Sequence, residues 1–287
     1  IKAQHTDVFA EVEPRQKERI IKTLQKSGLI VAYLGDGIND VAAINAADVG
    51  ISTNNATDVA KEAADFVFLE KDLSVLADGV QEGRKSFANS MKYIFITTGA
   101  TFGNMFSVAG ASLLLPFLPM LPKQILLTNL LTDLPFLTIA SDHVDEEQLK
   151  QPGKWNLKMI RNFMIVFGLH STIFDFITFY ILYAQLNLSG NEFRTGWFLE
   201  SAITEIIILF IIRTRHSFIK SKPGKFLLIT ALGAFVITVL LPMSPLSDML
   251  GFSTLHWSAL ILVVGILVIY TITADLVKIA FFKAHGG

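Results

Sequence analysis

Two aspartates that could bind a metal ion, Asp36 and Asp40, lie four residues apart in the glycine-rich stretch LGDGIND (34–40). The apolar run LIVAYL (29–34) comes directly before them and is typical of a strand buried on both faces. Parallel sheets bind ligands at the carboxyl ends of their strands, where we expect Asp36. Mg²⁺ takes one or two carboxylates with phosphate oxygens and water, and Lys17 of the preceding helix is available beside it. The structural alternative makes Asp36 a turn residue and Asp40 a helix cap.

Three other phosphate or metal motifs are excluded by single residues. Both Gly-Lys pairs precede an aromatic residue, Trp155 or Phe226, whereas a Walker motif needs serine or threonine there. Asp40 occupies the position of the third glycine in G-x-G-x-x-G, and Ile38 and Ala47 replace acidic positions of an EF-hand. The chain has no cysteine, so thiolate metal sites and cysteine nucleophiles are excluded and oxygen ligands remain.

The composition indicates a protein that faces lipid over much of its surface. Of its 287 residues, 52% are hydrophobic and 17% are charged, against about 25% charged in a typical soluble domain. The net charge of −1 provides no basic field, so we expect no nucleic-acid partner.

The first part of the chain alternates between short strands and helices, which predicts a parallel sheet with helices packed on its faces. The expected strands are 8–12, 29–34, 49–52 and 66–70, and the expected helices are 14–28, 39–47 and 56–65. We therefore predict an α/β domain over 1–84, which includes the start of a stalk, and a membrane domain over 85–287.

Six apolar runs in the second part are each about long enough to cross a hydrocarbon core. They are 93–115, 124–140, 160–186, 195–212, 226–242 and 257–280. The loop 213–225 is rich in lysine and arginine and the loop 241–256 has neither, which predicts that 213–225 is cytoplasmic. Counting spans from that loop puts the N-terminus, the acidic loop 141–155 and the C-terminus of this chain on the cytoplasmic side as well.

The first span continues from the α/β part without a break, because 73–115 contains no proline. If it is helical throughout, this segment is about 65 Å long at about 1.5 Å per residue. A rod of this length could carry movement from a cytoplasmic site into the bilayer.

Polar side chains in the second span could bind a cation. Asn129, Thr132 and Asp133 are spaced i, i+3 and i+4, which puts their oxygens on one helical face. Pro135 cannot donate a hydrogen bond to the carbonyl of Leu131, so that oxygen is a possible fourth ligand. A carboxylate at mid-membrane costs about 2.5 to 3.5 kcal/mol, so Asp133 is a functional candidate, with an interhelical hydrogen bond as the alternative.

Other spans hold further polar residues. Thr97, Thr101 and Asn104 share a face of the first span, beside glycines that permit close helix approach. Glu200 and Glu205 in the fourth span could equally serve an ion pathway or packing. The remaining ones are expected to make interhelical or interfacial contacts, and they are His170, Asp175 and Asp275.

Six stretches together resemble one known family. GDGIND with VEPRQK upstream, AADVGIS, AKEAAD, the stalk EGRKSFANSMKYI and the membrane motif NLLTD are similar to the P-type ATPases, a branch of the haloacid dehalogenase superfamily. The likeness is strongest to the bacterial magnesium-transporting pumps of that family. It implies an α/β haloacid-dehalogenase-like, Rossmann-like part of a phosphorylation domain, followed by an all-α transmembrane domain of six helices.

The resemblance also implies roles for single residues. In the turn, Asp36 would bind the catalytic Mg²⁺ with support from Asp40, Asn39 would contact the phosphoryl group, and Lys17 would neutralise its charge. The glycines implied on the cofactor side of the turn are Gly35 and Gly37, and the membrane residues implied as ligands of the transported cation are Thr101, Asn104, Asn129, Thr132 and Asp133. Two departures from the family pattern GDGxNDxPAL and its membrane site are Val41 with Ala42, and Thr101 where related pumps often have asparagine.

The function implied is an ATP-driven pump of the plasma (inner) membrane that transports Mg²⁺, with ATP as substrate and catalytic Mg²⁺ as cofactor. The phosphorylated aspartate of these pumps lies in a D-K-T-G-T motif, which this sequence lacks. The chain is therefore expected to be a C-terminal part that works with the lipid bilayer and with the N-terminal part of the same pump. The alternatives are a P-type H⁺ or Ca²⁺ pump, a membrane-anchored phosphatase of the dehalogenase type, and a membrane module that only senses ions.

Overall fold

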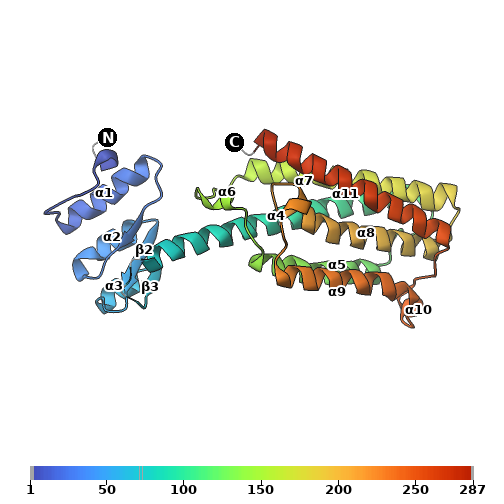
Figure 1. Cartoon of the computed structure of the whole chain (residues 1–287), viewed down its shortest axis with the longest axis horizontal. Coiled ribbons are helices and arrows are strands. Elements are labelled where there is room, and N and C mark those ends of the chain that lie inside the picture. Colours follow the sequence, from blue (N-terminus) through green and yellow to red (C-terminus); the bar gives the residue numbers. More distant parts are fainter. Residues whose placement is uncertain (1–2, 71, 73, 286–287) are drawn as a thin grey trace. The chain divides into compact units, whose positions relative to one another are not determined.

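The computed structural model describes residues 3–70, 72 and 74–285 and divides the chain into two units (Figure 1). The first unit is Ile1–Gln81, which holds the sheet, and the second is Glu82–Gly287, which is helical. The division lies three residues before the boundary expected from the sequence.

The first unit is built on a small parallel sheet with the strand order β1-β2-β3. The strands are β1 (Ala32–Leu34), β2 (Val49–Thr53) and β3 (Phe66–Phe68), and Ala32 pairs with Val49 and Ile51 with Phe66. The helices of this unit are η1 (Ala3–His5), α1 (Pro14–Lys26), η2 (Ile38–Asp40), α2 (Val41–Ala46) and α3 (Asp58–Ala63). The alternation of strands and helices predicted from the sequence is therefore confirmed from residue 14 onward.

Local sequence explains where α1 begins and ends. Pro14 takes the first helical position, where its missing N–H is no loss, and the backbone N–H of Glu13 donates to the side chain of Gln16 at 2.9 Å. Gly28 follows the helix with a φ of +82°, a conformation that favours glycine. On the inner side, α1 packs against α2, and Ile44 packs with Ala56 and Ala60 in a small core.

Two predictions for the first unit are wrong. Residues 8–12 form no strand, and the side chain of Val8 is 81% exposed. The apolar run 29–34 is a strand only from Ala32, and Leu29 and Ile30 are exposed instead of buried on both faces. The reason is topological, because β1 is an edge strand of this sheet and only β2 has a neighbour on each side.

The second unit consists of long helices joined by short turns (Figure 1). The long helices are α4 (Ser74–Leu114, which starts in the first unit), α5 (Pro122–Thr138), α7 (Leu157–Phe179), α8 (Gly190–Ile212), α9 (Lys225–Leu240) and α11 (Trp257–His285). The short elements are η3 (Ile139–Ser141), α6 (Glu146–Leu149), η4 (Tyr180–Gln185, a π-helical extension of α7), η5 (Phe218–Lys220), η6 (Leu241–Met243) and α10 (Ser247–Leu250). The helix expected over 73–115 is continuous from Ser74 to Leu114, and Leu73 lies outside the described residues.

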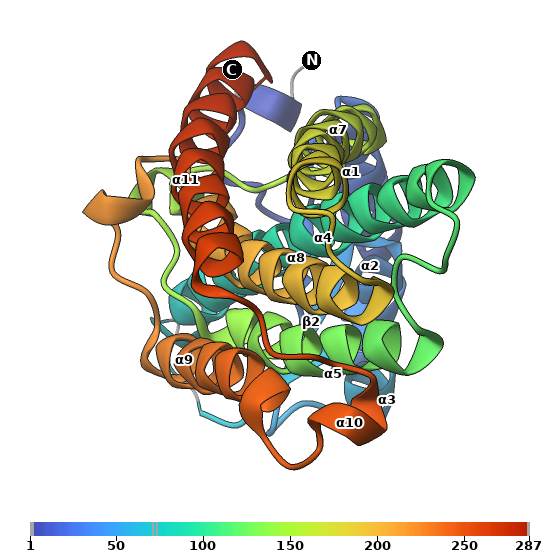
Figure 2. The same ribbon diagram turned by 90° about the vertical axis from the view of Figure 1, so that its right-hand side faces the viewer.

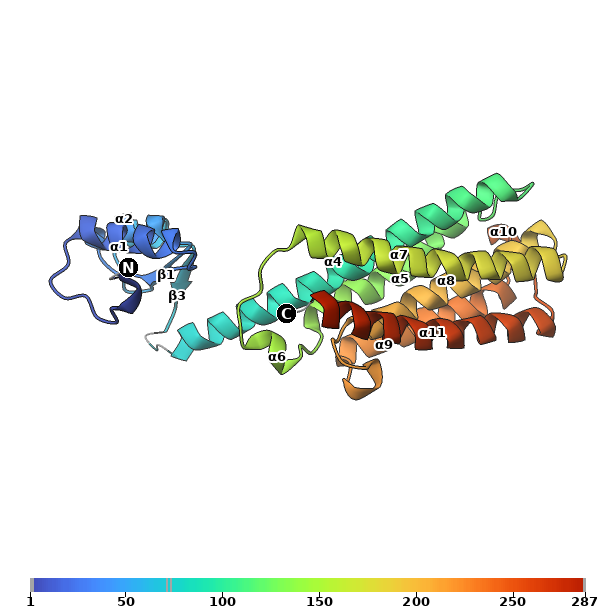
Figure 3. The same ribbon diagram turned by 90° about the horizontal axis from the view of Figure 1, so that it is seen from above.

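Helix α8 lies at the centre of the bundle and is surrounded by α5, α7, α9 and α11 (Figure 2). In its apolar 18-residue stretch, 89% of the residues are buried. In the corresponding stretches of α7 with η4, of α9 and of α11, at most 44% are buried. The helices α7, α8 and α11 run alongside one another (Figure 3). Side chains on α8 are therefore the best shielded in this unit.

By length and composition, four helices in the described part of the chain could cross a membrane. They are Leu157–Gln185, Gly190–Ile212, Lys225–Met243 and Trp257–His285. Helices α4 and α5 cover the first two predicted spans, but they do not meet the same limits of length, hydropathy and charge. Helix α5 has only 17 residues. The expected count of six spans is thus supported for four of them.

A buried ion cluster joins loops at one end of the second unit. The carboxylate of Asp142 has no exposed side-chain surface and accepts hydrogen bonds from Lys92 Nζ at 3.0 Å, Arg213 Nε at 3.0 Å and Gly224 N at 2.8 Å. Thr214 also donates to Asp145 at 3.0 Å. The loops 141–155 and 213–225 therefore meet at the same end of the bundle, as the counting of spans requires.

Candidate functional site

The glycine turn after β1 is organised around the carboxylate of Asp40, which is 9% exposed. Its Oδ1 accepts hydrogen bonds from Lys17 Nζ at 2.7 Å and Tyr33 Oη at 2.6 Å, and the N–H of Gly37 lies 3.4 Å from its Oδ2. A Cβ atom at Gly35 would lie only 2.5 Å from Cβ of Asp40, so this close approach requires glycine. The turn thus joins α1, β1 and η2 through one side chain.

The charges in this turn stabilise one another. Partial burial raises the pKa of Asp40, but hydrogen bonds from Lys17, Tyr33 and Gly37 outweigh it and leave the pKa of that carboxyl below its usual value. The hydrogen bond to Asp40 raises the pKa of Lys17. Burial, followed by the hydrogen bond to Asp40, raises the pKa of Tyr33. Lys17 is therefore a firmly held cation at the edge of the turn.

Asp36, Ile38 and Asn39 are exposed in the turn, and Asp36 and Asn39 are the polar ones among them. The backbone carbonyl of Asp36 accepts a hydrogen bond from Thr57 N at 3.0 Å, which fixes the main chain, but no described residue donates to its carboxylate. Asp36 can therefore bind a ligand, whereas Asp40 has only Oδ2 available beyond its bonds to Lys17 and Tyr33. Among the described residues no group of three or more acidic or histidine side chains could hold a metal ion. The turn accordingly suits Mg²⁺ only in its mode with one or two carboxylates plus phosphate and water.

A second polar cluster lies inside the helical unit, where α4, α5 and α8 meet. Asn104 Nδ2 donates to Glu205 Oε1 at 2.5 Å, and Thr132, whose hydroxyl donates to the carbonyl of Thr128 at 3.1 Å, lies beside the same carboxyl group. Glu205 is 6% exposed. A narrow cavity beside it is lined by Gly99, Asn104, Ser171, Thr204, Glu205 and Tyr270. The cluster therefore combines a carboxylate, an amide and a hydroxyl in protein interior.

The structure does not bring the five predicted membrane ligands together. Asn104 and Thr132 lie beside Glu205, but Asn129 and Asp133 are exposed on α5 next to the inward face, and Thr101 is exposed on α4. The reason is helical geometry, because positions 129, 132 and 133 span about 100° of the helix circumference. The face of α5 that packs inward ends between positions 132 and 133. Its buried residues include Thr128, Leu131, Thr132 and Pro135.

Pro135 does not unwind its helix. Helix α5 continues past it to Thr138 without a break, and the Leu131 carbonyl stays a predicted ligand. The Pro135 carbonyl accepts a hydrogen bond from Thr138 Oγ1 at 2.8 Å. An unwound segment at this position is therefore not supported.

Other polar residues of the spans make the interhelical contacts expected from the sequence. Asp175 on α7 accepts hydrogen bonds from α4 and α8, and His170 lies 3.0 Å from the hydroxyl of Thr273 on α11. Asp275 accepts from Ser217 Oγ at 2.8 Å, which ties α11 to the loop 213–225. These contacts place all three residues in packing between elements.

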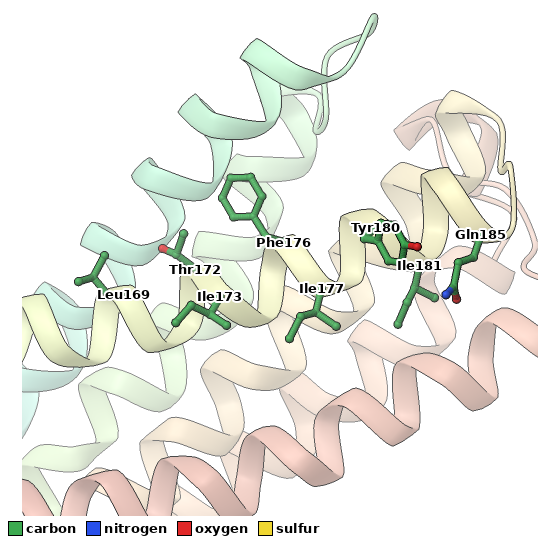
Figure 4. Close-up of a pocket in the computed structure, with 8 residues that line it drawn as sticks. All are labelled: Leu169, Thr172, Ile173, Phe176, Ile177, Tyr180, Ile181 and Gln185. Atoms are coloured by element: carbon green, nitrogen blue, oxygen red, sulfur yellow. The ribbon is translucent and has the colours of Figure 1, made fainter.

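A wide groove on the outer side of α7 contains none of the predicted site residues (Figure 4). It is lined almost entirely by apolar side chains, namely Leu169, Thr172, Ile173, Phe176, Ile177, Tyr180, Ile181 and Gln185. Such a surface suits hydrocarbon and offers no carboxylate to a cation.

Sequence reasoning missed three residues that organise these sites. Tyr33 was treated as part of an apolar strand, although its spacing from Asp40 puts its hydroxyl on the turn. Glu205 was left undecided because helical spacing alone does not show which neighbouring helix it faces. Asp142 gave no motif, and the only signal was an aspartate beside a loop rich in basic residues.

Comparisons with known proteins match both units. Residues 117–280 match the family described as cation transporting ATPase, C-terminus, and residues 16–80 match the haloacid dehalogenase-like hydrolases. The magnesium-transporting ATPase, P-type 1, of Escherichia coli (strain K12) is 43% identical over 99% of this chain and 32% of its own length, as is the protein of that name from Salmonella typhimurium (strain LT2). Calcium-transporting ATPase 1 of Bacillus cereus is 34% identical over 68% of this chain and 22% of its own length. The chain thus spans about a third of the length of the magnesium-transporting relatives.

Proposed function

Because the chain belongs to the P-type cation-transporting ATPases, we propose that it forms the C-terminal part of a pump that uses ATP to move Mg²⁺ across the plasma membrane. The observation that carries this proposal is helix α4, which runs unbroken from Ser74 to Leu114. It begins just after the sheet that holds the phosphate-type turn, and it contributes Asn104 to the buried cluster at Glu205. One continuous helix therefore starts in the unit that holds the turn and supplies a residue to the buried cluster of the other unit.

In the α/β unit, we propose that the turn 35–40 receives an aspartyl phosphate formed elsewhere in the pump. Asp36 would hold the catalytic Mg²⁺, which supplies charge stabilisation to the phosphoryl oxygens. Lys17, fixed by Asp40 at 2.7 Å, would neutralise a further phosphoryl oxygen, and Asn39 would donate a hydrogen bond from its exposed side chain. Gly35 and Gly37 would shape this turn, since the N–H of Gly35 already donates to the carbonyl of Ile51 at 3.0 Å and that of Gly37 faces Asp40 Oδ2. Asp40 thereby acts mainly by positioning Lys17.

In the membrane unit, we propose that Glu205, Asn104 and Thr132 bind the transported cation together with Asn129 and Asp133. The last two residues are exposed on α5, and an exposed carboxylate in a bilayer costs free energy unless protein or water surrounds it. We propose that the remaining N-terminal part of the pump covers this face of α5 and completes the ion path. The role of Thr101 in cation binding has no support, because its side chain is exposed without a polar neighbour from another described helix.

The test of the phosphorylation role uses a complete pump that contains this chain. Asp36→Ala should abolish phosphoenzyme turnover, whereas Asp58→Ala, an exposed aspartate of the same unit, should leave it unchanged. ATP hydrolysis that is unaffected by Asp36→Ala would refute the assignment of this turn.

The transported ion is tested by ATP hydrolysis and uptake in the same pump, titrated separately with Mg²⁺, Ca²⁺, Ni²⁺ and pH at constant nucleotide-bound metal. We expect stimulation by Mg²⁺ and a lowered response in Asp133→Asn, with exposed Asp248→Asn as the control. Stimulation by Ca²⁺ alone would favour the calcium pump, a relative of which is 34% identical. A dependence on pH alone would favour a proton pump, and a phosphatase would not respond to Asp133→Asn at all.

A further inference from the structure

A second pair of acidic side chains, Asp175 on α7 and Glu200 on α8, lies buried in the membrane unit. Their exposed fractions are 3% and 1%. The two carboxyl groups are within hydrogen-bonding range of each other. Neither residue belongs to the Asn104–Thr132–Glu205 cluster, and the proposed transport mechanism uses neither of them.

The hydrogen bonds to Asp175 show which of the two carries a proton. Trp197 Nε1 donates to Asp175 Oδ1 at 2.6 Å, and Ser107 Oγ donates to Asp175 Oδ2 at 2.6 Å. An indole N–H can only donate, so Oδ1 of Asp175 is an acceptor, and the Ser107 hydroxyl occupies Oδ2. Two ionised carboxylates cannot hydrogen-bond to each other, because neither has a hydrogen to give. The proton between the two carboxyl groups is assigned to Glu200, because Asp175 already accepts from the indole while Glu200 Oε2 faces no donor among the described residues.

The surroundings of Glu200 favour the neutral, protonated form. Its Oε2 is buried with no hydrogen-bond partner among the described residues, which is costly for a full negative charge. No described lysine or arginine bonds to either carboxyl group, and the buried cations Lys92 and Arg213 are held by Asp142 at the loop end of the bundle. A second negative charge beside Asp175 would meet like-charge repulsion as well as burial.

Other titratable groups lie on the helices packed around the pair. They are Glu205 on α8, Tyr270 on α11 and His170 on α7, and Asp133 on α5 lies nearer to Glu205. Helix α4 presents Ser107 to the pair, and the one titratable residue of α9 is Lys225 at its first turn. A metal ion is also disfavoured, because the N–H and O–H donors on Asp175 occupy the oxygens that it would need.

From this arrangement we propose that Asp175 and Glu200 form a proton-binding site inside the membrane unit, with one proton held between the two carboxyl groups. Asp175 is the acceptor, oriented by Trp197 and Ser107, and Glu200 is the group that gains and loses the proton. The proposal does not depend on which cation is pumped. It makes the packing of α7 on α8 sensitive to protonation, because loss of that proton removes the bond between the helices.

The test is infrared spectroscopy of the full chain in lipid vesicles at pH 7, where a protonated carboxyl group absorbs apart from ionised ones. We expect such a band in the wild-type chain, and we expect Glu200→Gln to remove it. The control Glu146→Gln, an exposed glutamate in the loop 141–155, should leave it intact. Absence of the band, or a band that disappears in Glu205→Gln and persists in Glu200→Gln, would overturn the proposal.

Thermal unfolding gives a second, independent readout. An amide at position 200 can still donate to Asp175, so Glu200→Gln should melt within about 2 °C of the wild type. Glu200→Ala leaves Asp175 without this donor and should melt clearly lower. If Glu200→Gln is destabilised as much as Glu200→Ala, Glu200 acts as an ionised group and the proton site does not exist.

Discussion

Replacing Asp142 by alanine should destabilise the helical unit more than most single substitutions. Among the described residues, the change removes the one carboxylate that pairs with two buried cations, Lys92 and Arg213, whose side chains are 5% and 1% exposed. Breaking a buried ion pair in this way costs about 3 to 5 kcal/mol, because it leaves charge without compensation. The expected loss lies near the lower value, since Lys92 keeps a bond to the carbonyl of His143 at 2.6 Å and Arg213 one to that of Ser221 at 2.8 Å.

In a unit of about 200 residues, each kcal/mol shifts the melting temperature by about 2 to 4 °C. Asp142→Ala should therefore melt about 6 to 12 °C below the wild type, measured by circular dichroism of the detergent-solubilised chain. The melting temperature of Asp142→Asn should lie between those of the wild type and Asp142→Ala, because the amide oxygen of asparagine can still accept from Gly224 N. The matched control is Glu146→Ala in the same loop, whose side chain is exposed. A loss of less than about 2 °C in Asp142→Ala would refute the reasoning, since it would mean that both cations reach water.

The remaining predictions concern the turn and the membrane cluster. Gly35→Ala should destabilise the α/β unit by about 1 to 3 kcal/mol, because its Cβ would lie 2.5 Å from Asp40. Gly37→Ala should be tolerated, because the nearest atom to its Cβ would be 3.7 Å away. Hydrogen exchange of residues 32–53 measures both effects, and equal protection in the two variants would contradict the packing argument. Because the pKa of Asp40 is lowered, the stability that this carboxylate contributes is present above about pH 4 and is lost as the pH falls through the folded-state pKa. In Asp40→Asn, the free energy of unfolding should therefore fall less steeply as the solution is acidified. Because the pKa of Lys17 is raised, the stability that this ammonium group contributes is present below about pH 10.4 and is lost as the pH rises through the folded-state pKa. A Lys17→Met chain that loses stability in alkali as steeply as the wild type would contradict this. In a complete pump, Glu205→Gln should weaken cation-stimulated ATP hydrolysis at least tenfold in apparent affinity, and an unchanged affinity would exclude Glu205 as a ligand.

Local sequence was sufficient for the elements of the α/β unit that lie close together in the chain. Strands and helices alternate at short spacing from Pro14 to Phe68, and the capping residues, glycines and apolar runs that define them are all local. The segment 8–12 failed for the opposite reason. Its alternating pattern is typical of a strand, but a strand also needs a neighbour to bond with, and none of the described residues pairs with it.

For the turn, the sequence identified the residues but not the different roles of its two aspartates. Spacing alone treats Asp36 and Asp40 as equivalent carboxylates. Tertiary contacts from Lys17 and Tyr33 commit Asp40 to hydrogen bonds and leave Asp36 exposed. Which carboxylate is free to bind a ligand is therefore a property of the folded unit.

The sequence by itself determined the family, the order of sheet and helices, and the apolar runs, because these follow from short motifs and from hydrophobic periodicity along one chain. The tertiary structure alone decided which polar side chains meet inside the helical unit. Asn104 and Glu205 are 101 residues apart, and Lys92 and Asp142 are 50 apart. A helix repeats its faces every 3.6 residues, so the sequence limits each side chain to one face, and only packing against neighbouring helices selects the face that turns inward.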